Sequence, residues 1–147
     1  MVSDSHLKEI LDKVKRPCIR YTEATEENVT QADCLIIDCY GLLSSIYRYG
    51  EISYIGGGFG VGIHNVLEAA VYGIPVVFGP NNKKFREAQH LLEQKGGFEV
   101  TGYDDFKRLM DKFLSDKACL QQAGKAAGNY VNHNAGALEK IMKDITL

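Results

Sequence analysis

The stretch from Ile52 to Pro80 constrains the fold of this chain most, because it reads as strand, glycine-rich turn, helix and strand in succession. Residues Ile52–Ile55 form a short apolar run with β-branched and aromatic side chains, which is typical of a buried strand. Five glycines within residues 56–62 allow a sharp turn, positive φ angles and close approach of other groups. A helical apolar period then ends at Gly73, and a second strand is predicted at Val76–Phe78.

The start of the helix after this turn predicts an anion site. Backbone N–H groups and the positive end of the helix dipole would meet over residues 62–65. His64 and Glu68 are four residues apart, so they would share one helix face. A carboxylate one turn inside such a helix can accept hydrogen bonds from a ribose diol, which indicates a nucleotide or nucleotide-sugar site.

A second interpretation of the same turn stays open. The glycines match neither the dinucleotide-binding nor the P-loop spacing, so they alone are weak evidence for a phosphate site. They can serve only the close packing of a strand-to-helix turn. In that case His64 is a capping or packing residue and Glu68 a solvated helix residue.

Length and charge exclude several classes of protein. The 147 residues suit a single domain with its own core. A net charge of −2 gives no electrostatic basis for binding nucleic acid. No apolar stretch is long enough to span a membrane, and no signal peptide is visible. The four cysteines lack metal-ligand spacing, which favours reduced thiols in a soluble, cytoplasmic protein.

Helices and strands are expected to alternate along the rest of the chain. Further strands are predicted at Cys18–Tyr21, Cys34–Asp38 (buried) and Phe98–Val100. Helices are predicted at Ser3–Lys15, Leu42–Tyr49, Lys83–Lys95, Tyr103–Leu114, Asp116–Val131 and Gly136–Ile145, with a break at Asn132–Ala135. This order predicts an α/β fold, a Rossmann-like parallel sheet of about five strands with helices on both faces.

Ligands of such sheets bind beyond the carboxyl ends of the strands. Residues 40–42 and 57–65 follow two strands, so they could line one crevice. The chain begins with a helix where an α/β unit would begin with a strand. We therefore expect a fragment whose first strand is missing.

The segment from Asp38 to Phe85 resembles a known family in several separated motifs. It reads DCYGLLSSIYRYGEISYIGGGFGVGIHNVLEAAVYGIPVVFGPNNKKF. The C-terminal half of the 3-deoxy-D-manno-octulosonic acid (Kdo) transferases typically shows D-x-x-G-E-L, a glycine-rich turn followed by G-G-H-N-x-L-E-x-A, then G-x-P-V-x-x-G-P and a Phe. The tail NHNAGALEKI is similar to the closing segment of the same family.

The resemblance implies a two-domain GT-B glycosyltransferase whose C-terminal domain, here residues 1–147, holds the donor CMP-Kdo. The acceptor would be the lipid A precursor, and the transfer would invert the anomeric centre with no cofactor and no metal at the donor phosphate. The catalytic base, a Glu, and the membrane anchor would lie in an N-terminal domain. The chain alone would then lack a catalytic residue, and the whole enzyme would work at the cytoplasmic face of the inner membrane.

The resemblance also implies which residues contact the donor. Tyr40, Gly41 and Leu42 would contact the cytidine or its phosphate. The second group is the segment Gly62, Ile63, His64, Asn65, Val66, Leu67 and Glu68. Within it, Asn65–Glu68 would contact the CMP, with Glu68 on the ribose hydroxyls, while His64 and the N–H groups near Gly62 would face the phosphate or the sugar carboxylate.

Three positions depart from the family pattern. Leu42 stands where many members have Glu, so only its backbone contact carries over. Ile63 replaces the second Gly of G-G-H-N, and Val66 replaces a common Pro at an early helical position. Two alternatives remain open beside this family: the donor domain of another GT-B protein, such as a UDP-sugar transferase or epimerase, and a non-catalytic interaction module.

Overall fold

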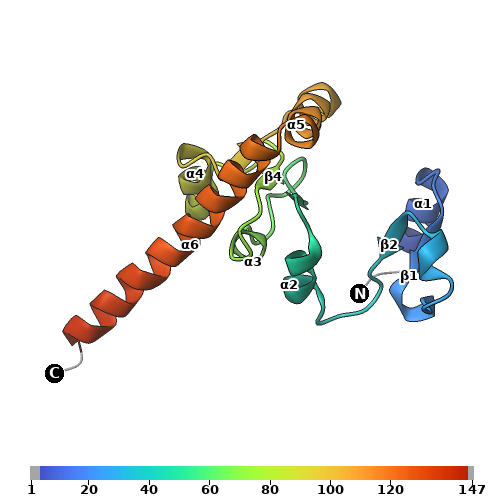
Figure 1. Cartoon of the computed structure of the whole chain (residues 1–147), viewed down its shortest axis with the longest axis horizontal. Helices are drawn as coiled ribbons and strands as arrows, with labels where there is room; N and C mark the ends of the chain where they lie inside the picture. Colours follow the sequence, from blue (N-terminus) through green and yellow to red (C-terminus); the bar gives the residue numbers. More distant parts are fainter. Residues whose placement is uncertain (1–3, 146–147) are drawn as a thin grey trace. The chain divides into compact units, whose positions relative to one another are not determined.

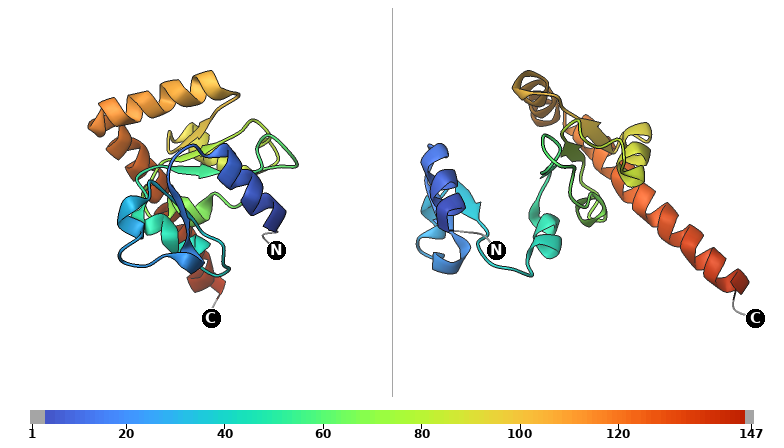
Figure 2. Two further views of the ribbon diagram at one scale, coloured as in Figure 1. Left: turned by 90° about the vertical axis from the view of Figure 1, so that its right-hand side faces the viewer. Right: turned by 180° about the vertical axis from the view of Figure 1, so that it is seen from behind.

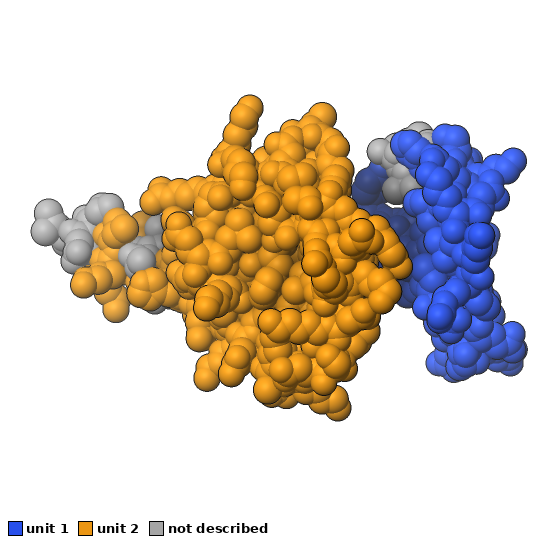
Figure 3. Space-filling model, turned by 90° about the horizontal axis from the view of Figure 1, so that it is seen from above, with its two compact units in different colours: residues 1–46 blue, residues 47–147 orange. Residues whose placement is uncertain are grey.

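The computed structural model describes residues 4–145, which form two compact units. Unit 1 is Met1–Ile46 and unit 2 is Tyr47–Leu147, coloured separately in Figure 3. Each unit is described by itself. That both make one nucleotide-sugar-binding domain stays a prediction.

Unit 1 is a small parallel pair of strands beside one helix (Figure 1). Helix α1 (Asp4–Lys13) precedes strands β1 (Cys18–Arg20) and β2 (Cys34–Ile36), and helix α2 (Leu43–Ile46) ends the unit. The predicted strand at residues 34–38 is therefore present, but its predicted burial is wrong, because Leu35 is 42% exposed. A three-residue strand with a single paired neighbour is only partly covered.

Unit 2 is built on a three-stranded parallel sheet (Figures 1 and 2). Its strands are β3 (Ser53–Ile55), β4 (Val76–Phe78) and β5 (Gly97–Glu99), with β4 in the centre. The other elements are a 3₁₀ turn at Tyr47–Tyr49 and the helices α3 (Leu67–Ala70), α4 (Arg86–Glu93), α5 (Tyr103–Ser115) and α6 (Lys117–Ile145).

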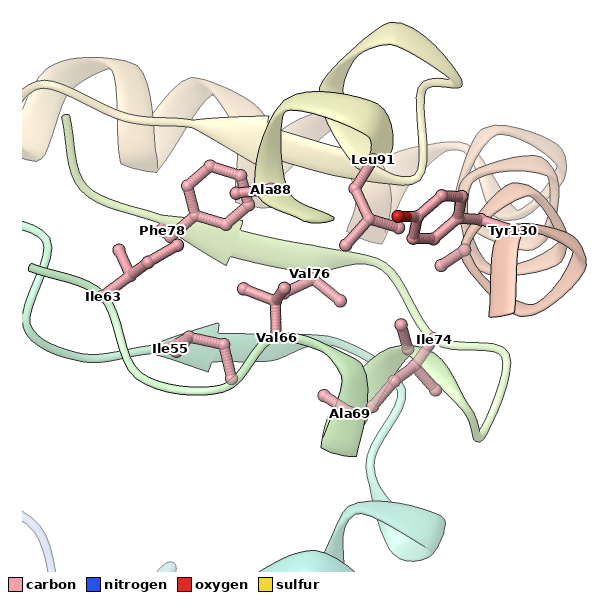
Figure 4. Packing of buried hydrophobic residues seen from close by; sticks show 12 residues of the cluster. Ile55, Ile63, Val66, Ala69, Ile74, Val76, Phe78, Ala88, Leu91 and Tyr130 are labelled. Atoms are coloured by element: carbon pink, nitrogen blue, oxygen red, sulfur yellow. The ribbon is translucent and has the colours of Figure 1, made fainter. Parts of the chain in front are cut away.

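Helices cover both faces of this sheet. Tyr54, Val77 and Phe98 are partners in register, so they share one face. Helix α5 packs there, since its Phe113 ring lies 5.3 Å from the Phe98 ring and its Phe106 ring 5.9 Å from the Tyr54 ring. The opposite face carries the main core under α3, α4 and α6 (Figure 4). This core consists of Ile55, Ile63, Val66, Ala69, Ala70, Ile74, Val76, Phe78, Ala88, Leu91, Ala127 and Tyr130.

The predicted α/β class and parallel strands are confirmed, with one difference in the sheet. The strands fall into a pair, β1–β2, and a triplet, β3–β4–β5, where one sheet of about five strands was expected. Apolar runs identify strands, but they do not say which strands are neighbours. Strands β2 and β3 follow each other along the chain and are not paired. A strand preceding Met1 stays a prediction.

The C-terminal part of the chain is one helix where two were expected. Helix α6 runs from Lys117 to Ile145, so the predicted break at Asn132–Ala135 is wrong. Asn and Gly each lower helix propensity by about 1 kcal/mol or less, and no proline interrupts this segment. The closing motif of the family resemblance lies in α6, although the side chains of residues 137–139 are outside the described ones. Among the described helices, none is both long and apolar enough to cross a membrane.

Candidate functional site

The glycine-rich turn of residues 56–62 packs its backbone against the loop that follows β4. A Cβ atom on Gly58 would come within 2.5 Å of the Cα atom of Gly79. Gly57 has φ +92°, and a Cβ atom there would collide with the carbonyl oxygen of Gly62. The Asn81 N–H donates to the Gly58 carbonyl at 2.7 Å. At Gly57 and Gly58 the glycines therefore serve close packing, which was the second interpretation of the turn.

The helix after this turn begins later than predicted. Helix α3 spans only Leu67–Ala70, with Val66 as its N-cap. His64 thus precedes the helix, and the predicted helix face shared with Glu68 is absent. A helix of one turn also has little macrodipole, so the dipole argument for an anion at residues 62–65 fails.

Most of the amides expected to be free at residues 62–65 are already bonded. The N–H groups of Gly62 and His64 donate to the carbonyls of Gly57 and Gly56, each at 3.0 Å. The Ile63 N–H donates to the Asn81 carbonyl at 3.3 Å. Tight turns consume the N–H groups that they orient, and the sequence pattern could not show this.

Two N–H groups remain available just before α3. Within residues 4–145, no hydrogen bond is formed by the N–H groups of Asn65 and Val66. The first N–H of the helix does have a partner, since Oδ1 of Asn65 accepts from the Leu67 N–H at 2.9 Å. The donors that could meet an anion are therefore at Asn65 and Val66.

A hollow of about 410 Å³ opens beside these residues. Its lining consists of Ile63, His64, Asn65, Val66, Leu67, Phe85 and Glu87. His64 and Asn65 are exposed at its mouth, whereas Val66 is buried in the core. The structure thus brings five predicted site residues together around one space of ligand size.

Phe85 and Glu87 belong to this hollow and were not predicted as site residues. The Phe85 ring packs against Gly62, where a Cβ atom would lie 3.1 Å from two ring carbons. Gly62 therefore has to lack a side chain for Phe85 to take this place. The Phe that closes the family motif was the signal for Phe85. Glu87 carried no signal, because an acidic residue in the first turn of a helix is ordinary.

Glu68 is half-buried on α3 and lies beside the hollow without lining it. Its charge acts on Tyr47. Burial raises the pKa of the Tyr47 phenol, and the negative charge of Glu68 raises it further. Tyr47 therefore keeps its proton at neutral pH. Spacing along the chain does not indicate this pairing, because the glycine-rich turn separates the two residues.

Residues 40–42 lie in unit 1, in the loop between β2 and α2. Tyr40 is exposed, Leu42 is half-buried and Gly41 has φ +88°, a conformation that favours glycine. Their meeting with residues 62–68 of unit 2 stays a prediction.

Asp38, the first residue of the D-x-x-G motif, anchors this loop. Its side chain is 1% exposed and accepts from the Thr22 hydroxyl at 2.6 Å, the Thr22 N–H at 3.0 Å and the Arg20 Nε at 2.9 Å. The Thr22 hydroxyl, followed by the Thr22 N–H and Arg20, lowers the pKa of the Asp38 carboxyl. The role of Asp38 in the motif is thus structural.

The described residues contain no group of three or more His, Cys, Asp or Glu side chains placed to hold a metal ion. The polar groups that line the hollow are the backbone N–H groups of Asn65 and Val66, the His64 imidazole, the Asn65 amide and the Glu87 carboxylate. The Glu68 carboxylate lies beside it.

Comparisons with curated proteins relate the chain to one kind of enzyme. No family model matches it. It is 36% identical to the 3-deoxy-D-manno-octulosonic acid transferase of Aquifex aeolicus over 89 residues, which are 59% of this chain and 25% of that protein. It is 27% identical to the enzyme of the same name from Rickettsia felis over 145 residues, 95% of this chain and 31% of that protein. The chain thus spans about a quarter to a third of these relatives.

A solved structure has the same fold. The C-terminal CMP-Kdo binding domain of WaaA from Acinetobacter baumannii superposes with a TM-score of 0.75 at 18% identity. The match covers 86% of this chain and 67% of that one. At this identity the likeness concerns the arrangement of the elements.

Proposed function

We propose that this chain, a relative of the Kdo transferases in sequence and of their C-terminal domain in fold, is the domain that holds the donor CMP-Kdo in such an enzyme. The observation that carries the proposal is the hollow lined by Ile63–Leu67. It is formed by the segment that matches the G-G-H-N-x-L-E motif of the family. A ligand-sized space and a family motif thus coincide at the same residues.

The groups at the hollow suit a cytidine monophosphate. The free N–H groups of Asn65 and Val66 can donate to a phosphate oxygen, and hydrogen bonds to a charged acceptor are the stronger ones. His64 can reach the phosphate or the sugar carboxylate from the exposed mouth. Glu68, half-buried beside the hollow, takes the ribose hydroxyls in this proposal. Tyr40, Gly41 and Leu42 complete the contacts to the cytidine.

The whole reaction needs more groups than this domain offers. Transfer of Kdo requires a base to deprotonate the acceptor hydroxyl and stabilisation of the departing CMP. We assign only the second task to this chain. The base and the site for the lipid A precursor would belong to another domain of the enzyme, at the cytoplasmic face of the inner membrane.

A titration of CMP into the ¹⁵N-labelled chain tests the donor site. We expect shifts of the amide signals of Asn65, Val66 and residues 40–42, with weak affinity because a single domain forms only part of a two-domain cleft. UDP should bind more weakly than CMP. Stronger binding of UDP would favour another GT-B donor domain, and absence of binding by both nucleotides would favour an interaction module.

The role of Glu68 can be isolated with CMP and its 2′,3′-dideoxy analogue. In the wild type the analogue should bind on the order of 10- to 100-fold more weakly, because a hydrogen bond to a carboxylate contributes about 1.5–3 kcal/mol. In the Glu68→Gln variant most of this difference should disappear. Glu93→Gln, on the exposed side of α4, is the matched control and should keep it. If the Glu68→Gln variant prefers CMP over the analogue as strongly as the wild type does, Glu68 does not contact the ribose hydroxyls.

A further inference from the structure

Asn82 is a fully buried polar residue in the loop after β4, outside the residues assigned to the donor. Its side-chain amide donates to the Gly79 carbonyl at 2.9 Å and to Oε1 of Glu99 at 2.7 Å. Its Oδ1 accepts from Nε2 of Gln89 at 2.8 Å. Every polar atom of this side chain therefore has a partner, which ties the loop to β5 and α4.

Glu99 is ionised where it meets Asn82. The amide of Asn82 and then the ammonium of Lys83, 3.2 Å away, lower the pKa of the Glu99 carboxyl. The Gln89 amide also donates to the Asn82 carbonyl at 2.8 Å, so both the side chain and the backbone of Asn82 are held. A buried polar network satisfied at all its atoms fixes one conformation, because any other leaves a buried group unpaired.

The neighbouring residue connects this fixed loop to the glycine-rich turn. The Asn81 side-chain amide donates to the Gly60 carbonyl at 2.5 Å, and the Asn81 N–H donates to the Gly58 carbonyl at 2.7 Å. The Asn81 carbonyl accepts from the Ile63 N–H, the first residue that lines the hollow. Three hydrogen bonds of one residue thus span the turn from its middle to its end.

We propose that Asn82 is a positioning residue of the donor site. Asn82 fixes the loop of residues 79–82, and Asn81 in this loop holds the glycine-rich turn. The turn in turn keeps Ile63–Leu67 in the conformation that receives the ligand. The link to the donor rests on the proposed function. The link from Asn82 to the turn rests on the hydrogen bonds alone. The two links can therefore fail separately.

The first test is hydrogen exchange in the Asn82→Asp variant of the whole chain. The substitution removes both donated hydrogen bonds and sets a carboxylate against Glu99. We expect the amides of Gly62 and Ile63 to exchange about tenfold faster, with Val77 in the central strand unchanged. CMP should bind about tenfold more weakly for the same reason. Unchanged exchange at Gly62 and Ile63 would overturn the proposal.

A reciprocal swap distinguishes positioning from general damage. In the double variant Asn82→Asp with Glu99→Gln, the new amide at 99 can donate to the new carboxylate at 82. We expect part of the lost protection and part of the lost CMP affinity to return, because the hydrogen bond between positions 82 and 99 is restored and the one to the Gly79 carbonyl is not. A double variant as impaired as the single one would refute the role of the Asn82–Glu99 hydrogen bond. Lys83→Gln, which removes only the exposed ion pair to Glu99, should leave exchange and affinity as they are.

Asn81→Ala keeps the proposal testable if Asn82→Asp does not fold. The Asn81 side chain is exposed, so its loss leaves the core intact. In Asn81→Ala the Gly62 amide should still exchange faster, by about threefold, because one hydrogen bond from Asn81 to the turn is lost. Equal or slower exchange would count against a link between Asn81 and the turn. If the wild type binds no CMP while Gly62 responds in these variants, the donor role is refuted and the hold of Asn82 on the turn is supported.

Discussion

Gly124 and Gly136 lie in the same helix, α6, and the structure predicts opposite effects of replacing each by alanine. A Cβ atom on Gly124 would fall on the carbonyl oxygen of Gly73 and lie 3.2 Å from its carbonyl carbon. The Gly73 N–H donates to the Ala70 carbonyl at 3.0 Å, so a shift of this backbone would disturb the turn after α3. A Cβ atom on Gly136 would meet no atom of the described residues within 4 Å.

The magnitudes follow from two opposing terms. Gly→Ala in a helix stabilises by about 1 kcal/mol, which is the whole effect expected for Gly136→Ala. Overpacking of a tight contact costs about 1–3 kcal/mol or more, and at Gly124 the clash is with backbone, which cannot rotate away. We expect Gly124→Ala to destabilise unit 2 by about 2 kcal/mol in net, which is the upper cost of about 3 kcal/mol less the helix gain of about 1 kcal/mol. For a unit of roughly 100 residues this corresponds to a fall in Tm on the order of 10 °C.

Thermal unfolding followed by circular dichroism at 222 nm measures both variants against the wild type. Gly136→Ala should melt a few degrees higher, and Gly124→Ala well below the wild type. If Gly124→Ala is as stable as Gly136→Ala, α6 does not approach the turn after α3 as closely as described, and the packing argument fails.

Two further outcomes follow from buried groups. Leu91 is a fully buried residue of α4, so Leu91→Ala should lower the free energy of unfolding by about 2–5 kcal/mol. Leu114 is exposed, so Leu114→Ala should change it by less than about 0.5 kcal/mol; urea denaturation measures both. Because hydrogen bonds lower the pKa of Asp38, its stabilisation of unit 1 is present above the unfolded pKa near 3.8 and is lost as pH falls through the lower folded value. The amide signals of β1 should therefore report unfolding of unit 1 as the pH falls. In the Asp38→Asn variant this unfolding should depend less on pH. An equally steep pH dependence in the variant would mean that another group causes the acid unfolding.

The elements were predictable where periodicity was strong. The stripe of α4, the helix α5 and strands β3, β4 and β5 lie within a few residues of their predicted places, because apolar period and glycine boundaries agree there. A break in α6 is predicted from Asn and Gly, but the helix runs through residues 132–136, which are exposed. Their propensity penalties are small and no proline interrupts the segment, so the helix continues without core packing at these positions.

The candidate site is only partly accessible to reasoning from the sequence. The segment 63–67 lines one hollow, and its contact with the donor stays a prediction. The predicted anion site at a helix start over residues 62–65 is wrong, because α3 begins only at Leu67. The N–H groups of Gly62 and His64 are hydrogen-bonded within the glycine-rich turn. Which N–H groups stay free depends on the partner each one finds in three dimensions. Spacing along the chain cannot say this.

The order of the strands explains why a loop without predicted site residues contacts the glycine-rich turn. Strands β3 and β4 are parallel neighbours, so their carboxyl ends lie side by side and the loops that leave them must meet. The glycine-rich turn follows β3 and the loop of residues 79–82 follows β4, and they meet at Gly58 and Gly79. Without side chains at this contact the two backbones can bond through Asn81. The glycines at positions 58 and 79 therefore admit the second loop, and in the proposed site the N–H groups of Asn65 and Val66 depend on both loops together.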